Sequence, residues 1–146
     1  MKLKIESLIL LSVVIFAVFV RGCSCGRFSK PRILKPVHAT ITNYLVDGAD
    51  LHIHCRSKDN DLGEQTLANN AQFSWTFKVN VMFSTLFWCD MWYNDVNGIQ
   101  VTGKFDIYKA QRDWDRCYNE CQFFVRKDCI AGYINGGVEC LYAWPQ

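Results

Sequence analysis

Residues 73–81 alternate strictly between apolar and polar side chains, and this pattern constrains the fold more than any other feature of the chain. On an extended strand, the five apolar residues would share one face, and Ser, Thr, Lys and Asn would share the other. Such a strand belongs in an antiparallel sheet with one face in water. Outside an apolar run near the N-terminus, the sequence shows no long helical periodicity. We therefore expect an all-β fold.

Seven further segments have the composition of short strands bounded by turn residues. With 73–81 they predict a small, disulfide-bonded antiparallel β-sandwich of about eight strands. The first two segments are joined through Asp47-Gly48, a turn signal, so we expect them to form a hairpin. The seven segments are 37–44, 51–56, 85–93, 99–108, 122–126, 130–134 and 138–142.

The segment 51–63 combines a half-buried strand with a charged turn. Leu51, Ile53 and Cys55 fall on one side of a period-2 pattern, and His52, His54 and Arg56 fall on the other. Residues 57–63 are rich in Asn, Asp, Ser and Gly, whose side chains favour turns. We expect these seven residues to form a structured loop.

The segment 85–93 differs from the other strands because both of its faces are apolar. Phe87, Cys89 and Met91 share one face. The other face carries Leu86, Trp88 and Trp92. Two interpretations are open: this second face packs under another layer of the core, or it is exposed and anchors a partner.

The N-terminus has the organisation of a secretory signal peptide, with two lysines before the apolar run Leu8 to Val20. The run is too short for a transmembrane helix, which needs about 20 apolar residues. We expect residues 1–26 to be removed, although cleavage after Gly22 also fits the small-residue rule. Residues 27–36 form a basic leader, and 37–146 form the domain. We therefore expect a secreted protein that does not insert into the membrane after cleavage.

The chain has eight cysteines, and Cys23 and Cys25 lie between the two cleavage points, so the mature chain keeps eight or six. An even number in a secreted chain indicates disulfides. Removing 1–26 takes away three positive charges and one negative charge, so the formal charge falls from +2 to 0. A neutral chain without a basic stripe is a poor nucleic-acid binder.

Five motifs, in order and spacing, closely resemble the plant self-incompatibility S1 family over roughly residues 37–121. The most specific of them is His54-Cys55-x-Ser57-Lys58-Asp59-x-Asp61-Leu62-Gly63. The others are Val37 to Asn43, Phe73-x-Trp75-x-Phe77, Thr85-Leu86-Phe87-x-Cys89 and Phe105-Asp106-x-Tyr108. The resemblance implies a secreted plant β-sandwich with two disulfides and no enzymatic activity. The prototype of the family acts as a stigma-side determinant that a pollen membrane receptor detects.

The resemblance also assigns structural roles to cysteines. The family's four cysteines correspond to Cys55, Cys89, Cys117 and Cys121, whose pairing the sequence leaves open. Cys129 and Cys140 are additions that could form a third bridge across the last hairpin. A two-residue turn at Asn135-Gly136 would place these two cysteines out of register, so such a bridge favours a longer turn, 133–136.

Patterns that suggest other chemistry are weak. His52 and His54 would point away from Cys55 on a strand, which argues against a metal site. Asp59-x-Asp61-x-Gly63 lacks the later glycine and glutamate of an EF-hand loop. Neither a Ser57, His54 and Asp59 triad nor a ribonuclease with two histidines and a basic groove has support from the spacing and the charge. We expect no enzyme activity and no cofactor.

We expect a monomeric signalling ligand that a plant cell-surface membrane receptor, a protein, recognises through loops and aromatic or charged anchors. The candidate loops are 47–50, 94–98 and 109–116. Two interpretations of Trp114 are open: it is a recognition tip, or it simply packs against the domain. The alternative is a secreted defence or antimicrobial protein, which a cationic amphipathic surface would favour. An unsuspected hydrolase is a third hypothesis. Candidate contact residues are Asp47, Asp50, Trp88, Asn94, Asp95, Arg112, Trp114 and Arg116.

Overall fold

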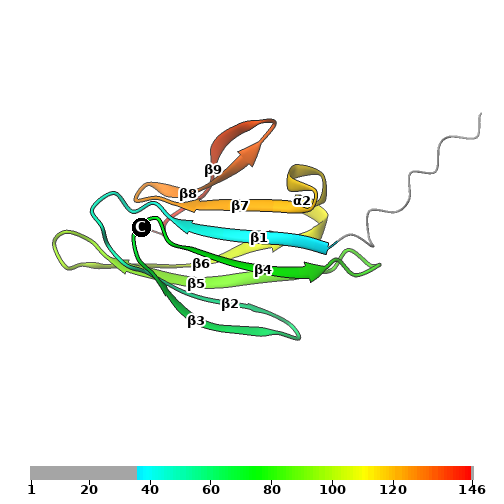
Figure 1. The fold of residues 1–146 in the computed structure, drawn as a ribbon, viewed down its shortest axis with the longest axis horizontal. Coiled ribbons are helices and arrows are strands. Elements are labelled where there is room, and N and C mark those ends of the chain that lie inside the picture. The colour runs from blue at the N-terminus through cyan, green and yellow to red at the C-terminus, as the bar shows by residue number, and fades with distance from the viewer. Residues whose placement is uncertain (1–35, 146) are drawn as a thin grey trace, which may run out of the picture. The chain divides into compact units, whose positions relative to one another are not determined.

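The computed structural model describes residues 36–145, which form two facing β-sheets and one short helix (Figure 1). The five-stranded sheet has the order β4 (Gln72–Lys78), β1 (Pro36–Asn43), β7 (Glu120–Val125), β8 (Cys129–Ile134) and β9 (Gly137–Ala143). The four-stranded sheet has the order β3 (Asp61–Leu67), β2 (Leu51–Ser57), β5 (Leu86–Asn94) and β6 (Gln100–Lys109). Helix α2 (Ala110–Cys117) links β6 to β7.

The core lies between the two sheets and follows the predicted alternation. On β1, Val37, Ala39 and Ile41 are buried, and on β2 Ile53 and Cys55 are buried. These side chains meet in one hydrophobic cluster, to which both sheets contribute. Because one face of each sheet is buried, the period-2 pattern determines which residues face inward. The predicted disulfide-bonded β-sandwich is confirmed.

The strand count and one pairing differ from the prediction. There are nine strands in the described part, because Asp61–Leu67 forms β3, an edge strand beside β2. The prediction of a loop over 57–63 is therefore wrong for its last three residues. The turn ends before Asp61, and residues 61–63 begin the largely exposed strand β3. All pairs are antiparallel except β1 with β7, which run parallel. Helix α2 carries the chain from β6 in one sheet to β7 in the other.

The predicted hairpin between the first two strands is wrong. Strand β1 pairs with β4 and β7, whereas β2 pairs with β3 and β5 in the other sheet. The connecting segment crosses between the sheets because Asn43, fully buried, holds it there. Its side-chain amide donates to the carbonyl oxygens of Ala49 and Leu67, each at 2.8 Å, and its Oδ1 accepts from the Leu45 amide at 2.9 Å.

Replacing Asn43 with alanine is expected to lower the free energy of unfolding by roughly 2–3 kcal/mol, because two carbonyls and one amide lose their partner and a buried unpaired group costs about 1–3 kcal/mol. Urea unfolding at neutral pH measures the change. The exposed turn residue Asn97 is the control, and Asn97→Ala should cost less than about 0.5 kcal/mol. Equal losses in the two variants would contradict the role given to Asn43.

The C-terminal hairpin shows how a bridge can fit a tight turn. Ile134 pairs with Gly137, so the turn is the two-residue Asn135-Gly136, and both residues have positive φ, as type I′ turns require. The longer turn expected for a bridge is therefore wrong. The ladder shifts register between Ile130 and Ala131, beside the bridge, and Cys129 and Cys140 are bonded with a Cα–Cα distance of 5.8 Å.

Candidate functional site

Three disulfides fix the scaffold that carries the candidate residues. Cys55 and Cys89 are directly opposite one another on β2 and β5, and their bridge is fully buried. A second bridge joins Cys117, at the end of α2, to Cys121 on β7. Cys129 and Cys140 join β8 to β9. Cys23 and Cys25 lie outside the described residues. The loops between strands are thus attached to a cross-linked framework.

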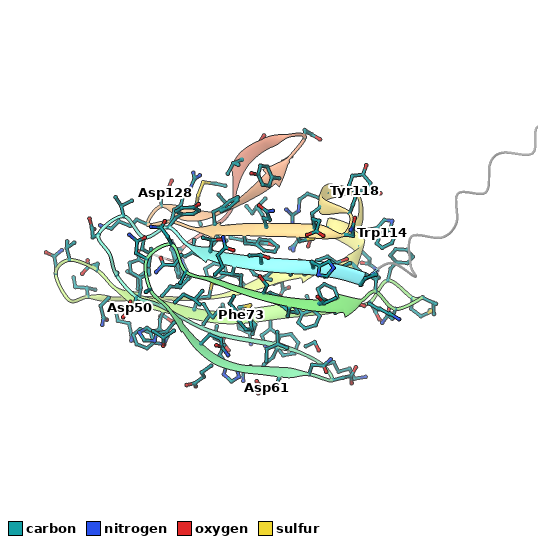
Figure 2. All side chains as sticks on the ribbon, in the orientation of Figure 1. Asp50, Asp61, Phe73, Trp114, Tyr118 and Asp128 are labelled. Atoms are coloured by element: carbon teal, nitrogen blue, oxygen red, sulfur yellow. A yellow bond between two sulfur atoms is a disulfide. The ribbon has the colours of Figure 1, made fainter. Side chains whose placement is uncertain are left out.

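Half of the candidate contact residues lie at one end of the sandwich, where the β1–β2 and β5–β6 connections meet. Asp47 forms an ion pair with Lys127. Asp50 is exposed at this end (Figure 2). Asn94 is the exposed last residue of β5. The carboxylate of Asp95 fixes its own turn, because Oδ1 accepts from the amides of residues 97 and 99 at 2.9 and 2.8 Å.

Sequence reasoning missed the apolar side chains of this end. Val46, Val96 and Ile99 are 79%, 70% and 62% exposed. Isolated valines and isoleucines within a sequence carry no signal of exposure, and only the observed loop positions reveal it. Scattered exposed apolar residues are normal, but several on the same end of a rigid domain give a partner something to bury.

The other candidate charges lie on α2, a segment that the sequence predicted as a loop. That prediction is wrong, because Ala110, Asp113 and Cys117 form the buried side of a helix of eight residues, which is too short to give a long periodic signal. The helix lies at the end of the sandwich opposite the β5–β6 turn (Figure 1). Its charged residues Arg112 and Arg116 form ion pairs with Asp113 of the same helix.

Asp113 is completely buried, and Arg112 and Arg116 turn toward it. Arg112 donates from Nη2 to Oδ2 at 2.6 Å, and Arg116 donates from Nε to Oδ1 at 2.8 Å. The backbone amide of Lys109 also donates to Oδ2, at 2.8 Å, which caps the start of the helix. The two arginines therefore pair with the buried carboxylate. No feature of the sequence indicates that Asp113 is internal.

The surroundings of Asp113 determine its charge. Burial alone would raise the pKa of this carboxyl group, but hydrogen bonds from Arg112, the Lys109 amide and Arg116 outweigh it and hold the pKa below its ordinary value of 3.8. Nearby, burial raises the pKa of Tyr108 to about 12. Asp113 is thus an anion at neutral pH, and the cluster is an internal ion network and not a reactive site.

Trp114 is half-buried, not a free tip. Its ring packs edge-on against Phe83 of the β4–β5 loop, with ring centroids 5.3 Å apart. Figure 2 shows Trp114 at the helix, at the opposite end of the sandwich from Asp50; Trp114 is itself a residue of α2. The same loop carries Val81 and Met82, which are 75% and 78% exposed. Trp114 therefore supports the loop that presents these two side chains.

Trp88 lies on the outer face of the four-stranded sheet. Leu86, Trp88 and Trp92 are half-buried there, so the interpretation as a second core layer does not hold. Lys104 lies over the Trp88 ring at 5.8 Å, and His52 stacks on Trp92 with ring centroids 3.6 Å apart. Neighbouring side chains on the sheet, rather than another layer, cover part of each ring.

The histidines and the turn acids have partners of their own. His54 Nε2 lies 2.6 Å from Asp61 Oδ1, and His52 shares a hydrogen bond with Thr66. The Gly63 amide and His54 together lower the pKa of Asp61. Ser57 Oγ accepts from the Asn60 amide, and the hydrogen bonds found in the described residues do not join it to His54. These contacts fix the β2–β3 turn.

Metal-ligating side chains converge at one point of the described chain. Asp128, Cys129 and Cys140 lie close together, but the two sulfur atoms are bonded to each other and so are not thiolate ligands. In residues 36–145 no helix is long and apolar enough to cross a membrane.

A cleft of about 700 Å³ opens between β4 and the turn that joins β2 to β3. Its walls combine apolar side chains from both sheets with the polar turn 57–60. Two lysines, Lys58 and Lys78, stand exposed among the residues that line it. Sequence reasoning missed this cleft because its walls come from separate segments. The apolar lining residues are Leu62, Trp75, Phe77, Leu86, Phe87 and Trp88.

The fold and the bridged cysteines define a class, the small disulfide-bonded β-sandwiches. The family model of plant self-incompatibility protein S1 matches residues 38–144, and the chain belongs to this family. The resemblance stated from the sequence motifs is therefore confirmed.

Curated relatives agree with this assignment. S-protein homolog 29 of Arabidopsis thaliana is 33% identical over 147 residues, which cover 99% of each chain. S-protein homolog 24 of the same plant is 34% identical and covers 91% of this chain and 89% of its own. S-protein homolog 1 is 49% identical over 103 residues, 68% of this chain and 66% of its own.

A solved structure shares the fold. It matches with a TM-score of 0.56 at 20% identity and covers 77% of this chain and 96% of its own. That structure represents self-incompatibility protein homologues, described as a widespread family of small, highly stable, secreted proteins from plants. The expected secretion is confirmed at the level of the family.

Proposed function

We propose that the mature protein is a non-catalytic, monomeric ligand in plant cell-to-cell signalling and that a receptor protein at the cell surface recognises it. The observation that carries the proposal is the contrast between a cross-linked core and exposed apolar loop residues. Three disulfides hold the sandwich, while Val81, Met82, Val96 and Ile99 lie largely in water. A rigid scaffold with apolar loop tips suits recognition of a protein surface.

The buried charges support the same proposal. The carboxylate of Asp113 forms ion pairs with Arg112 and Arg116. These three side chains therefore stabilise the helix next to the β4–β5 loop and do not form a catalytic pair. Through Phe83, Trp114 holds that loop in place. Pre-organised loops lose less conformational entropy when a partner binds.

The experiment measures binding of labelled, oxidised mature protein to pollen, root and leaf cells, with unlabelled protein as competitor. We expect saturable binding that reduced and alkylated protein lacks. Light scattering of the same sample should give the mass of one chain. Absence of saturable binding on all three cell types would contradict the proposal, and inhibition of microbial growth by the same sample would then favour a defence function.

Two double variants test the two ends of the sandwich. Val81→Ser/Met82→Ser and Val96→Ser/Ile99→Ser each remove exposed apolar surface, so the fold should remain while binding weakens at the end that the receptor contacts. We expect at least one variant to bind about tenfold or more weakly, the loss that corresponds to about 1.4 kcal/mol. Unchanged affinity in both variants would exclude these loops as the recognition surface.

A further inference from the structure

The free edge of β4 borders the cleft, and the register shows which peptide groups it exposes. The His38 amide donates to the Asn119 carbonyl oxygen on the β7 side of β1, at 2.8 Å. Because peptide groups alternate in direction along a strand, Val37 and Ala39 turn theirs toward β4. Their partners are Phe77 and Trp75.

Thr76 and Lys78 alternate with these two residues along β4, and they therefore direct their N–H and C=O groups away from β1. Strand β4 stands at the end of its sheet, so no other strand of the described chain covers this edge. An exposed row of backbone donors and acceptors is a template for another extended chain. Both residues also line the cleft, so a chain added to β4 would lie in it.

The cleft wall holds an unpaired donor. Trp75 is about nine-tenths buried, and its indole N–H has no hydrogen-bond acceptor among the described residues. This nitrogen is itself closed to solvent, so a molecule bound in the cleft contacts the ring of Trp75 and not its N–H. The surrounding side chains, Phe77, Leu62 and Phe87, offer apolar contacts to the same molecule.

The charge of the cleft favours an anionic occupant. Lys58 and Lys78 line it and are exposed, and none of the ion pairs found in residues 36–145 involves either of them. Asp59 is the single acidic residue of the lining, so the charge is positive on balance. Carboxylates of a partner would complement the two lysines.

We propose that this cleft binds an acidic, extended peptide segment of a partner protein, which adds to β4 as an outer strand. Carboxylates of the segment contact Lys58 and Lys78, and its apolar side chains enter the cleft. The inference rests on the proposed function, since the partner protein would be the cell-surface receptor. An acidic polysaccharide shares the charge but lacks the matched row of N–H and C=O groups that the edge of β4 offers, which is why a peptide is the occupant we infer.

The first test uses fluorescent synthetic peptides of about eight residues, a typical strand length, in which aspartate or glutamate alternates with valine, phenylalanine or tyrosine. Neutral peptides of the same length serve as reference. We expect the acidic peptides to bind, and Lys58→Glu/Lys78→Glu to weaken them about tenfold or more. Arg126→Glu/Lys127→Glu, which makes the same charge change in the β7–β8 turn, outside the lining of the cleft, should leave affinity within about twofold. Equal loss in both variants, or no preference for acidic peptides, would overturn the proposal.

The second test follows the edge itself. Thr76→Pro removes an outward N–H without removing a bond to β1, and proline is tolerated on edge strands; it should abolish peptide binding. Because this variant could misfold, hydrogen exchange of the wild-type protein gives an independent readout. The amides of Thr76 and Lys78 should exchange about tenfold or more slowly with peptide bound. Unaltered exchange at both amides would overturn strand addition.

Oligogalacturonate is the competing probe. If it binds through Lys58 and Lys78, and Thr76→Pro leaves its affinity unchanged while acidic peptides fail to bind, the cleft takes an acidic polysaccharide and the peptide proposal is wrong. Cell binding separates this inference from the proposed function. Saturable cell binding that Lys58→Glu/Lys78→Glu and Thr76→Pro both retain would refute the cleft proposal and leave receptor recognition intact.

Discussion

Replacing Asp113 with alanine is expected to lower the free energy of unfolding by about 3 kcal/mol or more. The carboxylate is fully buried and is shared by two guanidinium groups and a backbone amide. Removing one partner of a buried ion pair costs about 3–5 kcal/mol, because the remaining charge is left without compensation. Arg116 is only 11% exposed and would be left buried without a partner, which is the source of the cost. The Arg112 side chain is 39% exposed and can turn to water, so we place the total cost near the lower limit of that range.

Urea unfolding at pH 7, with the disulfides intact, measures this loss. Gln111→Ala, on the exposed side of the same helix, is the control, and its effect should stay within about 0.5 kcal/mol. A loss below about 1 kcal/mol for Asp113→Ala would show that the ion network does not stabilise the helix against the sheet.

The same network predicts a dependence on pH. The pKa of Asp113 is lower in the folded protein than its ordinary value of 3.8. Its stabilisation is therefore complete above about pH 4 to 5 and is lost as the pH falls through the folded-state pKa. The difference in stability between wild-type protein and Asp113→Asn should shrink over that acidic range, and a difference that grew there would contradict the assigned pKa direction.

Removing the bridge between Cys55 and Cys89 is the second large effect, about 4 kcal/mol. The two cysteines are 34 residues apart, and a bridge that closes a long loop stabilises by restricting the unfolded chain. The chain-entropy relation gives about 4 kcal/mol for a loop of this length. Cys55→Ala/Cys89→Ala also leaves a small gap between the sheets, where both residues are fully buried.

The bridge between Cys117 and Cys121 provides the control, because these residues are only 4 apart. The same relation gives about 2 kcal/mol for Cys117→Ala/Cys121→Ala. Urea unfolding of both double variants compares them directly. The long-loop variant should be the less stable of the two, and the reverse order would contradict this account of what holds the sandwich together.

Local pattern was enough to predict eight of the nine strands in the described residues, all but β3. Alternation at 51–56 and over 73–79 predicted which side chains turn inward, because a sheet with one wet face imposes a period of two. At Val81 the prediction was wrong, because β4 ends at Lys78 and Val81 lies exposed in the loop that follows. The pattern carries no information about which strand lies next to which. The expected β1–β2 hairpin was therefore wrong, since the deciding contacts are the tertiary hydrogen bonds of Asn43.

The candidate site was less predictable than the fold. Asp113 lies in a run of charges that resembles a solvated loop, and its burial depends on the two arginines beside it. The cleft residues Lys58 and Lys78 are 20 positions apart in sequence, and the fold alone places them around one opening. The sequence also does not distinguish an exposed valine at a loop tip, such as Val81, from a buried valine on a strand.

Protease treatment of the target cells tests the central claim, recognition by a protein receptor, most directly. Saturable binding of labelled wild-type protein would be measured on intact cells and on cells exposed to trypsin and then washed free of it. We predict that trypsin removes the saturable sites, while cells treated with inactivated trypsin keep them. Saturable binding that survives the digestion unchanged would contradict a protein receptor and point to a cell-wall or lipid component.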